Sequence, residues 1–310
     1  MPQKILTTAF IILLACSLRA QQLYHKWLGP VGAEKTLVFL HGGPGYNSAN
    51  FEFDMAPRLA KMGYQVLVYD QRGSGRSEGM TGEFTYPEAV ADLHGLLTAK
   101  GVKKAYLLGH SFGGTVAVKF ADAHADMVAA VVLISAPMDF PACFRAIQAN
   151  CLEAMDIKED TIGPKSIKAL AAMDTTTLEY SGTNFMYAMS NGLYSPSEDF
   201  KSGRKVKAKL ARDPLGKWAK KSSFAPVKGF FEKEHYIMGN HFSLLAEVSK
   251  TVPCYAILGD EDGLFDEAAI KKFQEVLEND VYVLSLASHA VFLDDPYGFL
   301  DALGEILSRQ

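Results

Sequence analysis

The sequence predicts an α/β fold in which a mostly parallel central sheet is flanked by helices and a mainly helical cap is inserted between core strands. Short β-branched apolar runs, nearly continuous rather than alternating, are typical of strands buried on both faces of a parallel sheet. These runs cover residues 36–40, 65–69, 105–108, 128–135, 252–258 and 281–286. Helical patterns lie between several of them, at residues 86–100, 115–125 and 268–278. This alternation favours a three-layer arrangement.

The first helical pattern has a clear start. Thr85 is suited to cap it, Glu88 three residues later completes a capping box, and Pro87 falls in the first turn. From about residue 138 to 250 the strand pattern stops, and Ala, Met and Lys become frequent. We therefore expect residues 21–137 and 251–310 to be two parts of one core, and residues 138–250 to be the helical cap.

Composition excludes some classes of partner. The chain has 310 residues, 48% hydrophobic and 21% charged, which is enough to bury a large core. Its formal net charge of -4 gives no global attraction to nucleic acid or anionic lipid. Lysines gather at residues 201–209 and 217–221, which we interpret as a solvated helix face or loop. No CxxC pattern or His/Cys cluster indicates a metal site, and no cofactor is expected.

Residues 1–20 are typical of an export signal. Lys4 precedes an apolar segment at residues 5–14, and small residues follow before a cut that we place after Ala20. An alternative is a lipoprotein signal, since residues 13–16 resemble the motif in which Cys16 is lipidated. We expect an exported protein, periplasmic or secreted, whose contact with a membrane would be a lipid anchor at Cys16.

Cleavage of the signal would leave three of the four cysteines. Cys143 and Cys151 are eight residues apart, so on one continuous helix they would be separated by about 12 Å, too far for a disulfide. A bridge between them would need a bend in the chain.

The run GHSFGG at residues 109–114 joins an apolar strand pattern to a helical one. A nucleophilic serine on a sharp strand-to-helix turn needs very small neighbours, which Gly109 and Gly113 supply. Such a turn exposes the Ser111 hydroxyl and leaves the Phe112 N–H at a helix N-terminus, where the helix dipole favours negative charge. We expect Ser111 to be the nucleophile and Phe112 N–H to be an oxyanion donor.

A serine nucleophile needs a base, and the base needs an acid to orient it. His289 lies in a loop after the strand pattern at residues 281–286, and carboxyl ends of strands are where open α/β sheets place active groups. Three acids, Asp260, Glu261 and Asp262, follow the preceding strand. Asp294 and Asp295 come soon after His289 and are interpreted as a pair that caps the last helix.

Two further loops follow early strands. HGGPG at residues 41–45 allows close approach of backbone to a substrate carbonyl, so Gly43 N–H is the expected second oxyanion donor, with the His41 side chain in a structural role. In DQRGSGRS at residues 70–77 no lysine falls at P-loop spacing. Asp70 and Arg72 are therefore expected to fix this loop near the floor of the site.

Together HGGPG, DQRGSGRS and GHSFGG resemble the α/β-hydrolase superfamily, and in particular its proline iminopeptidase (prolyl aminopeptidase) branch. The chain order Ser111, Asp262, His289 is the order used by that superfamily, and its loop spacing favours Asp262 over Asp260. Epoxide hydrolases and haloalkane dehalogenases of this fold have Asp at the nucleophile position, where this chain has Ser111.

The resemblance implies a serine peptidase that releases an N-terminal residue, commonly proline, from short peptides. Family peptidases hold the substrate ammonium with carboxylates of the cap, and Glu232 and Glu234 are the candidates here. Alternatives left open are a carboxylesterase or thioesterase acting on small acyl substrates, and a binding protein without activity. The expected partner is a small molecule or short peptide, no nucleic acid is expected, and the oligomeric state stays open.

Overall fold

The computed structural model describes residues 23–157, 163–198 and 200–309. The expected export signal and Cys16 lie outside these residues, so export stays a prediction. At the centre is a seven-stranded sheet in the order β1-β3-β2-β4-β5-β6-β7, in which only β1 runs antiparallel to its neighbour. The strands are β1 His25–Leu28, β2 Thr36–Leu40, β3 Gln65–Tyr69, β4 Ala105–His110, β5 Val128–Ile134, β6 Cys254–Gly259 and β7 Val281–Leu284.

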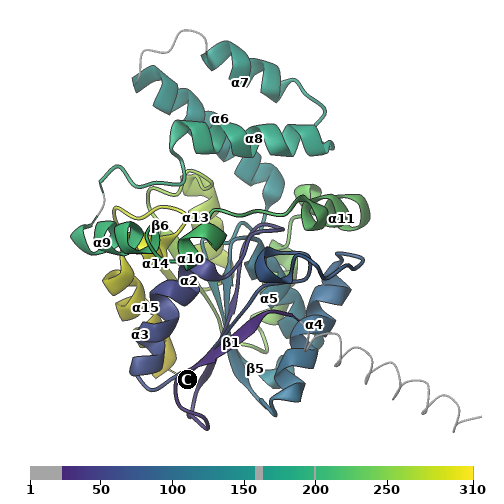
Figure 1. The fold of residues 1–310 in the computed structure, drawn as a ribbon. Coiled ribbons are helices and arrows are strands. Elements are labelled where there is room, and N and C mark those ends of the chain that lie inside the picture. Colours follow the sequence, from purple (N-terminus) through teal and green to yellow (C-terminus); the bar gives the residue numbers. More distant parts are fainter. Residues whose placement is uncertain (1–22, 158–162, 199, 310) are drawn as a thin grey trace, which may run out of the picture.

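Helices cover both faces of the sheet, as the alternation of patterns predicts (Figure 1). On one face the apolar core is shared with α4 Tyr86–Ala99, α5 Phe112–Ala123, α12 Phe242–Val248 and α13 Glu267–Val276. On the other it is shared with α2 Ala49–Phe53, α3 Met55–Lys61, α14 Val291–Asp294 and α15 Pro296–Ser308. Successive strand residues alternate between the two cores: Val38 and Leu40 face the first, and Leu37 and Phe39 the second.

The predicted strands are found with small changes at their ends, whereas several short elements were not predicted. Among them are β1, α2, α3 and α14. Strand β1 lies at the sheet edge and is only partly buried, so its sequence HKWL lacks the apolar run that marks the central strands. At α4 the Thr85 side chain accepts from Glu88 N at 3.3 Å, and the Glu88 carboxylate accepts from Phe84 N at 2.8 Å, one residue before the capping-box position.

Helices make up the segment between β5 and β6. They are α6 Phe140–Ile157, α7 Gly163–Ala171, α8 Leu178–Asn191, α9 Lys201–Leu210, α10 Leu215–Trp218, α11 Phe224–Glu234 and α12, with a 3-10 turn, η3, at Tyr236–Met238. Figure 1 shows α7 and α8 farthest from the sheet, with α9, α10 and α11 between them and the core. We call the segment from α6 to α11 the cap. An isolated antiparallel bridge between Asp139 and Asn240 joins its two ends.

Cys143 and Cys151 lie on the single helix α6, so the bend that a bridge would need is absent there. In the described residues Cys143, Cys151 and Cys254 are buried, and none of the three forms a disulfide. Among the helices that the structure describes, none combines the length and the apolar character needed to cross a membrane.

Candidate active site

The turn after β4 holds Ser111 in a strained conformation. Strand β4 ends at His110 and α5 begins at Phe112, three residues earlier than the helical pattern suggested. Between them Ser111 has φ 54° and ψ −127°, a region that residues with a side chain rarely adopt. A Cβ at Gly113 would lie 2.2 Å from the Leu40 carbonyl oxygen, so this helix can start so close to the sheet only with glycine there.

His289 and Asp262 come together from the loops that follow β7 and β6. The His289 Nδ1 and Asp262 Oδ2 atoms are 2.9 Å apart. Asp262 is buried, and its other oxygen accepts from Leu264 N at 3.1 Å, which fixes the carboxylate. Because Nδ1–H donates to the carboxylate, Nε2 is left as the acceptor in the neutral ring. Asp260 is exposed, and Glu261 accepts from Ser197 of the cap, so the structure places Asp262 rather than either neighbour against His289.

A second histidine, not singled out from the sequence, links the Ser111 turn to the loop of His289. His110 Nε2 donates to the His289 carbonyl oxygen at 2.9 Å, and the two ring centroids are 4.9 Å apart. Burial, followed by the nearby His289, lowers the pKa of His110 to about 3, so this ring stays neutral. The signal in the sequence was its position: a polar residue at the end of an apolar strand, directly before Ser111.

The loop after β2 lies against the same serine. A Cβ at Gly42 would be 2.7 Å from Ser111 Cβ and 3.2 Å from its Oγ. The His41 ring holds this loop in place: Nδ1 donates to the Gly42 carbonyl at 2.8 Å and Nε2 accepts from Gln71 N at 2.9 Å. Burial lowers the pKa of His41, which keeps it in this neutral tautomer. The expected structural role of the His41 side chain is therefore confirmed.

His41 also sets the direction of the Gly43 N–H. The Gly42 carbonyl and the Gly43 N–H belong to one planar peptide and point in opposite directions. Because the carbonyl is bound to His41, the N–H is turned away from that ring. In the described part of the chain neither Gly43 N–H nor Phe112 N–H has a hydrogen-bond partner, so both are free to bind an incoming oxygen.

Asp70 fixes the loops beside this site, as expected from the sequence. It is fully buried and accepts from Ser48 N at 2.9 Å and from Arg76 Nε at 2.7 Å. Burial raises the pKa of Asp70, but the hydrogen bonds and charge of Arg76, with His41, outweigh this and lower it. Arg76 also pairs with Glu52 at 2.5 Å and lies over the Tyr24 ring.

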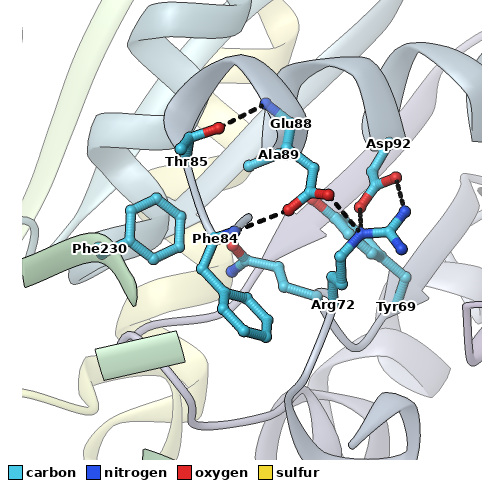
Figure 2. Close-up of a pocket in the computed structure, with 9 residues that line it drawn as sticks. Tyr69, Arg72, Phe84, Thr85, Glu88, Ala89, Asp92 and Phe230 are labelled. Carbon is cyan, nitrogen blue, oxygen red and sulfur yellow. Dashed lines mark hydrogen bonds and ion pairs between the residues drawn. The ribbon is translucent and has the colours of Figure 1, made fainter. Parts of the chain in front are cut away.

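Arg72 fixes the neighbouring loop, as Figure 2 shows. It makes a bidentate pair with Asp92 at 2.9 and 2.5 Å, lies 3.5 Å from Glu88, and donates to the Thr81 carbonyl at 3.1 Å. The pocket beside these groups is about 20 Å³, room for about one water molecule. Its charged lining groups are already paired with one another, so it is a packing gap rather than a substrate site.

The two cap carboxylates have other partners. Glu232 is exposed on α11 and lies 3.7 Å from Lys228, one turn away. Glu234 accepts from Tyr86 N at 2.8 Å and so joins the end of α11 to the start of α4. In the described residues we find no contact of either carboxylate with Ser111 or His289. The geometry thus places Glu232 on the cap surface and makes Glu234 part of the cap's attachment to the core.

The expectation that Asp294 and Asp295 both cap the last helix is correct for Asp295 and wrong for Asp294. Asp295 does cap α15, accepting from Gly298 N at 3.1 Å. Asp294 is instead buried: it accepts from Ser288 N at 2.9 Å and pairs with Lys207 of α9 at 2.7 Å. Asp294 is buried because α14 turns its last residue inward, under the loop that carries His289. Lys207 is distant in the sequence, so nothing near Asp294 in the chain indicates this ion pair.

This sheet order, with a strained serine turn after β4 and an acid and a histidine after the last two strands, defines a class of α/β hydrolases. Residues 35–296 match the family described as alpha/beta hydrolase fold, and the chain belongs to that family. In residues 23–157, 163–198 and 200–309, no group of three or more His, Cys, Asp or Glu side chains is arranged to hold a metal ion.

Several curated relatives are similar over part of the chain. Proline iminopeptidase of Saccharolobus solfataricus is 31% identical over 54% of this chain and 53% of its own length, and that of Clostridioides difficile is 39% identical over 32% and 34%. Epoxide hydrolase B of Mycobacterium tuberculosis is 40% identical over 33% of this chain and 28% of its own length. The chain thus spans about a quarter to a half of the length of these relatives.

Solved structures match over nearly the whole chain. A proline iminopeptidase-related protein of Thermus thermophilus has a TM-score of 0.66 and 26% identity, covering 92% of this chain and 93% of that one. A carboxylesterase of Nitrososphaera gargenis has a TM-score of 0.61 and 22% identity, covering 92% and 94%, which shows the shared fold alone. These likenesses confirm the predicted superfamily and the resemblance to its proline iminopeptidase branch.

Proposed function

We propose that this protein is a serine hydrolase in which Ser111 is the nucleophile, His289 the general base and Asp262 the residue that orients the base. The observation that carries the proposal is the pairing of a strained, glycine-flanked Ser111 at the start of α5 with the 2.9 Å contact of His289 Nδ1 and Asp262 Oδ2. A strained turn persists where the surrounding structure enforces it, and such turns gather at catalytic sites.

The first half of the reaction forms an acyl-enzyme. His289 Nε2 takes the hydroxyl proton as Ser111 Oγ attacks the carbonyl carbon, and Asp262 stabilises the imidazolium. The Gly43 and Phe112 N–H groups donate to the oxyanion. In sites of this kind each donor stabilises the transition state by roughly 3 kcal/mol. The imidazolium then gives its proton to the leaving amine or alcohol as the carbonyl re-forms.

The second half repeats these steps with water as the nucleophile. His289 removes a proton from the water, the same two N–H groups hold the second oxyanion, and Ser111 leaves with the proton of the imidazolium. The atoms and protons of every step balance with groups of the chain, the substrate and water.

For the substrate, we propose the N-terminal residue of a short peptide, as in the proline iminopeptidase type. The tandem HGGPG and DQRGSGRS loops and the similarity to two named proline iminopeptidases support this choice. A carboxylesterase or thioesterase is the second candidate, because Glu232 and Glu234 are engaged elsewhere and leave the substrate ammonium without the expected partners. The epoxide hydrolase likeness is not carried over, since the residue in the turn is serine.

A substrate panel separates these candidates. We expect prolyl and alanyl N-terminal amides to be hydrolysed with higher kcat/KM than nitrophenyl esters of small acids. The reverse order, with amides hardly cleaved, would favour the esterase. A fluorophosphonate probe should label wild-type protein at Ser111, as shown by mass spectrometry of the labelled peptide.

Replacing the nucleophile tests the chemistry itself. Ser111→Ala should lower turnover by roughly 10³-fold or more on every substrate of the panel while leaving the thermal midpoint nearly unchanged, since the backbone demands at this position are the same for Ala. Ser308→Ala, at an exposed position, is the matched control and should behave as wild type. Retained turnover in purified Ser111→Ala would remove the nucleophile assignment.

A further inference from the structure

Hydrogen bonds join the cap to the loop that carries the proposed oxyanion donor Gly43. Ser223 N donates to the Gly45 carbonyl at 2.8 Å. Asn47 Nδ2 donates to the Trp218 and Lys221 carbonyls at 2.7 and 3.0 Å, and the Tyr46 hydroxyl donates to the Ala219 carbonyl. Three consecutive residues just after Gly43 and Pro44 are thus bound to the end of α10 and to the connection between α10 and α11.

The connection between α8 and α9 of the cap is hydrogen-bonded to the residues on both sides of the proposed acid, Asp262. Gly263 N donates to the Leu193 carbonyl at 3.1 Å, on one side of Asp262. On the other side, the Ser197 hydroxyl donates to Glu261 Oε1 at 2.7 Å. The packing is close as well, because a Cβ at Gly263 would lie 2.5 Å from Leu193 Cβ.

The same connection reaches the proposed base. Ser288, the residue before His289, has its Oγ 2.9 Å from the Tyr194 carbonyl and 2.6 Å from Asp294 Oδ2. The Tyr194 ring meets the His289 ring edge-on, with centroids 5.2 Å apart. Helix α9 completes the arrangement through the 2.7 Å pair of Lys207 Nζ with Asp294 Oδ1.

We propose that the docked cap positions the proposed catalytic groups, and that Lys207 is the positioning residue that couples α9 to the base through Asp294 and Ser288. This inference rests on the proposed function, because it concerns the same Ser111, Asp262 and His289. Displacing α9 or the two connections would move the oxyanion loop, the acid and the base together, and so lower the rate of the chemical step.

Lys207 is the best point at which to test the coupling. Its side chain is 33% exposed, whereas that of Asp294 is 2% exposed, so the lysine reaches a buried carboxylate from the surface. Removing its charge leaves the carboxylate buried without this cation, a costly state that favours rearrangement or water entry beneath Ser288. The lysine is remote in sequence from the reacting groups, and no contact between it and Ser111 is found in the described residues.

The test compares Lys207→Met with Lys207→Arg, and with Lys205→Met on the exposed side of the same helix. The readouts are the rate of fluorophosphonate labelling of Ser111, kcat and KM on the best substrate of the panel, and thermal unfolding. Because misplacement of reacting groups by about 1 Å can cost up to a hundredfold, we expect Lys207→Met to slow labelling and kcat roughly tenfold with KM little changed. Lys207→Arg should recover most of the rate, and Lys205→Met should match wild type.

A double-mutant cycle identifies the route of the coupling. Lys207→Met and Asp294→Asn should each slow labelling, and the double variant should be no slower than the slower single variant, because both changes break one pair. Losses that multiply, or wild-type labelling in Lys207→Met, would overturn the proposal. Should Lys207→Met fail to fold, Ser197→Gly, which removes an exposed hydroxyl beside Glu261, is put through the same assay, and a wild-type rate there would also overturn it.

The outcomes separate this proposal from the proposed function. Wild-type protein that fluorophosphonate never labels at Ser111 would overturn both. Labelling of wild type at an ordinary rate, with no slowing in folded cap variants, would leave the serine hydrolase standing and overturn only the positioning role of the cap.

Discussion

At the scale of single residues, two neutral histidines next to the proposed catalytic groups hydrogen-bond to backbone carbonyls. His41 holds the Gly42 carbonyl and His110 holds the His289 carbonyl. Burial lowers the pKa of both, to about 3 for His110, which keeps each ring neutral with a single N–H donor. A charged ring at either position would have to find a second acceptor inside the core.

We expect His110→Phe to lower kcat roughly tenfold while KM changes little, because a ring of similar size is kept but the donor to the His289 carbonyl is lost. Steady-state kinetics on the best panel substrate measures this. His94→Phe is the matched control, since His94 lies on α4 and stacks on His124 at 4.5 Å. Equal kinetics for His110→Phe and His94→Phe would mean that the His289 backbone needs no such anchor.

At the scale of elements, the site depends on how closely α5 approaches the sheet. Gly113 lies against the Leu40 and His41 carbonyl oxygens, at 2.2 and 2.7 Å from where a Cβ would be placed. Neither oxygen can move freely, because Leu40 belongs to the fully buried strand β2 and His41 to the hydrogen-bonded loop after it. A side chain would therefore push α5, and with it Ser111 and Phe112, away from β2.

Gly113→Ala should lower the free energy of unfolding by about 3 kcal/mol, the upper range for overpacking, and should also reduce fluorophosphonate labelling. Gly182→Ala is the matched control in α8, where nothing lies within 4 Å of the added Cβ. That change should raise stability by up to about 1 kcal/mol through helix propensity. Urea unfolding of both variants decides the point, and equal stabilities would contradict the close approach of α5.

At the scale of the whole molecule, buried histidines make folding sensitive to acid. Burial lowers the pKa of His110 to about 3, and burial together with Lys119 lowers the pKa of His241 to about 4. In the unfolded chain a histidine titrates near pH 6.5. Below pH 6.5 the unfolded state binds more protons than the folded state. The contribution of these two neutral histidines to the free energy of unfolding is therefore fully present above pH 6.5. It is lost as the pH falls toward 4 for His241 and toward 3 for His110.

The expected loss at pH 5 from His110 alone is about 2 kcal/mol relative to pH 7.5. Urea unfolding at a series of pH values between about 7.5 and 4.5 measures it. His110→Gln should flatten the curve by about one proton in this window. The pKa of Asp70 is lowered from an ordinary value of 3.8, so its protonation changes stability only at lower pH than this window. An unchanged slope in His110→Gln would show that this ring is protonated in the folded protein.

Much of the fold was predictable because parallel strands buried on both faces need continuous apolar residues. Five of the six predicted runs match β2 to β6 to within two residues at each end, and the sixth ends at Leu284 in β7 rather than at Leu286. The strand β1 was missed because an edge strand can keep polar residues. The turn at Ser111 was predictable because glycines are required on both sides of it, a local demand that a sequence displays directly.

The amino-acid sequence by itself determined the order of the core elements, the serine turn and the positions of the candidate acid and base, because these follow from local periodicity and glycine spacing. Only the tertiary structure decided that Asp294 is buried beneath the loop of His289 and that the cap is hydrogen-bonded to the loops around the site. These features depend on contacts between residues far apart in the chain, such as Lys207 with Asp294 and Asn47 with Trp218. The local sequence around one partner does not indicate which distant residue it will contact.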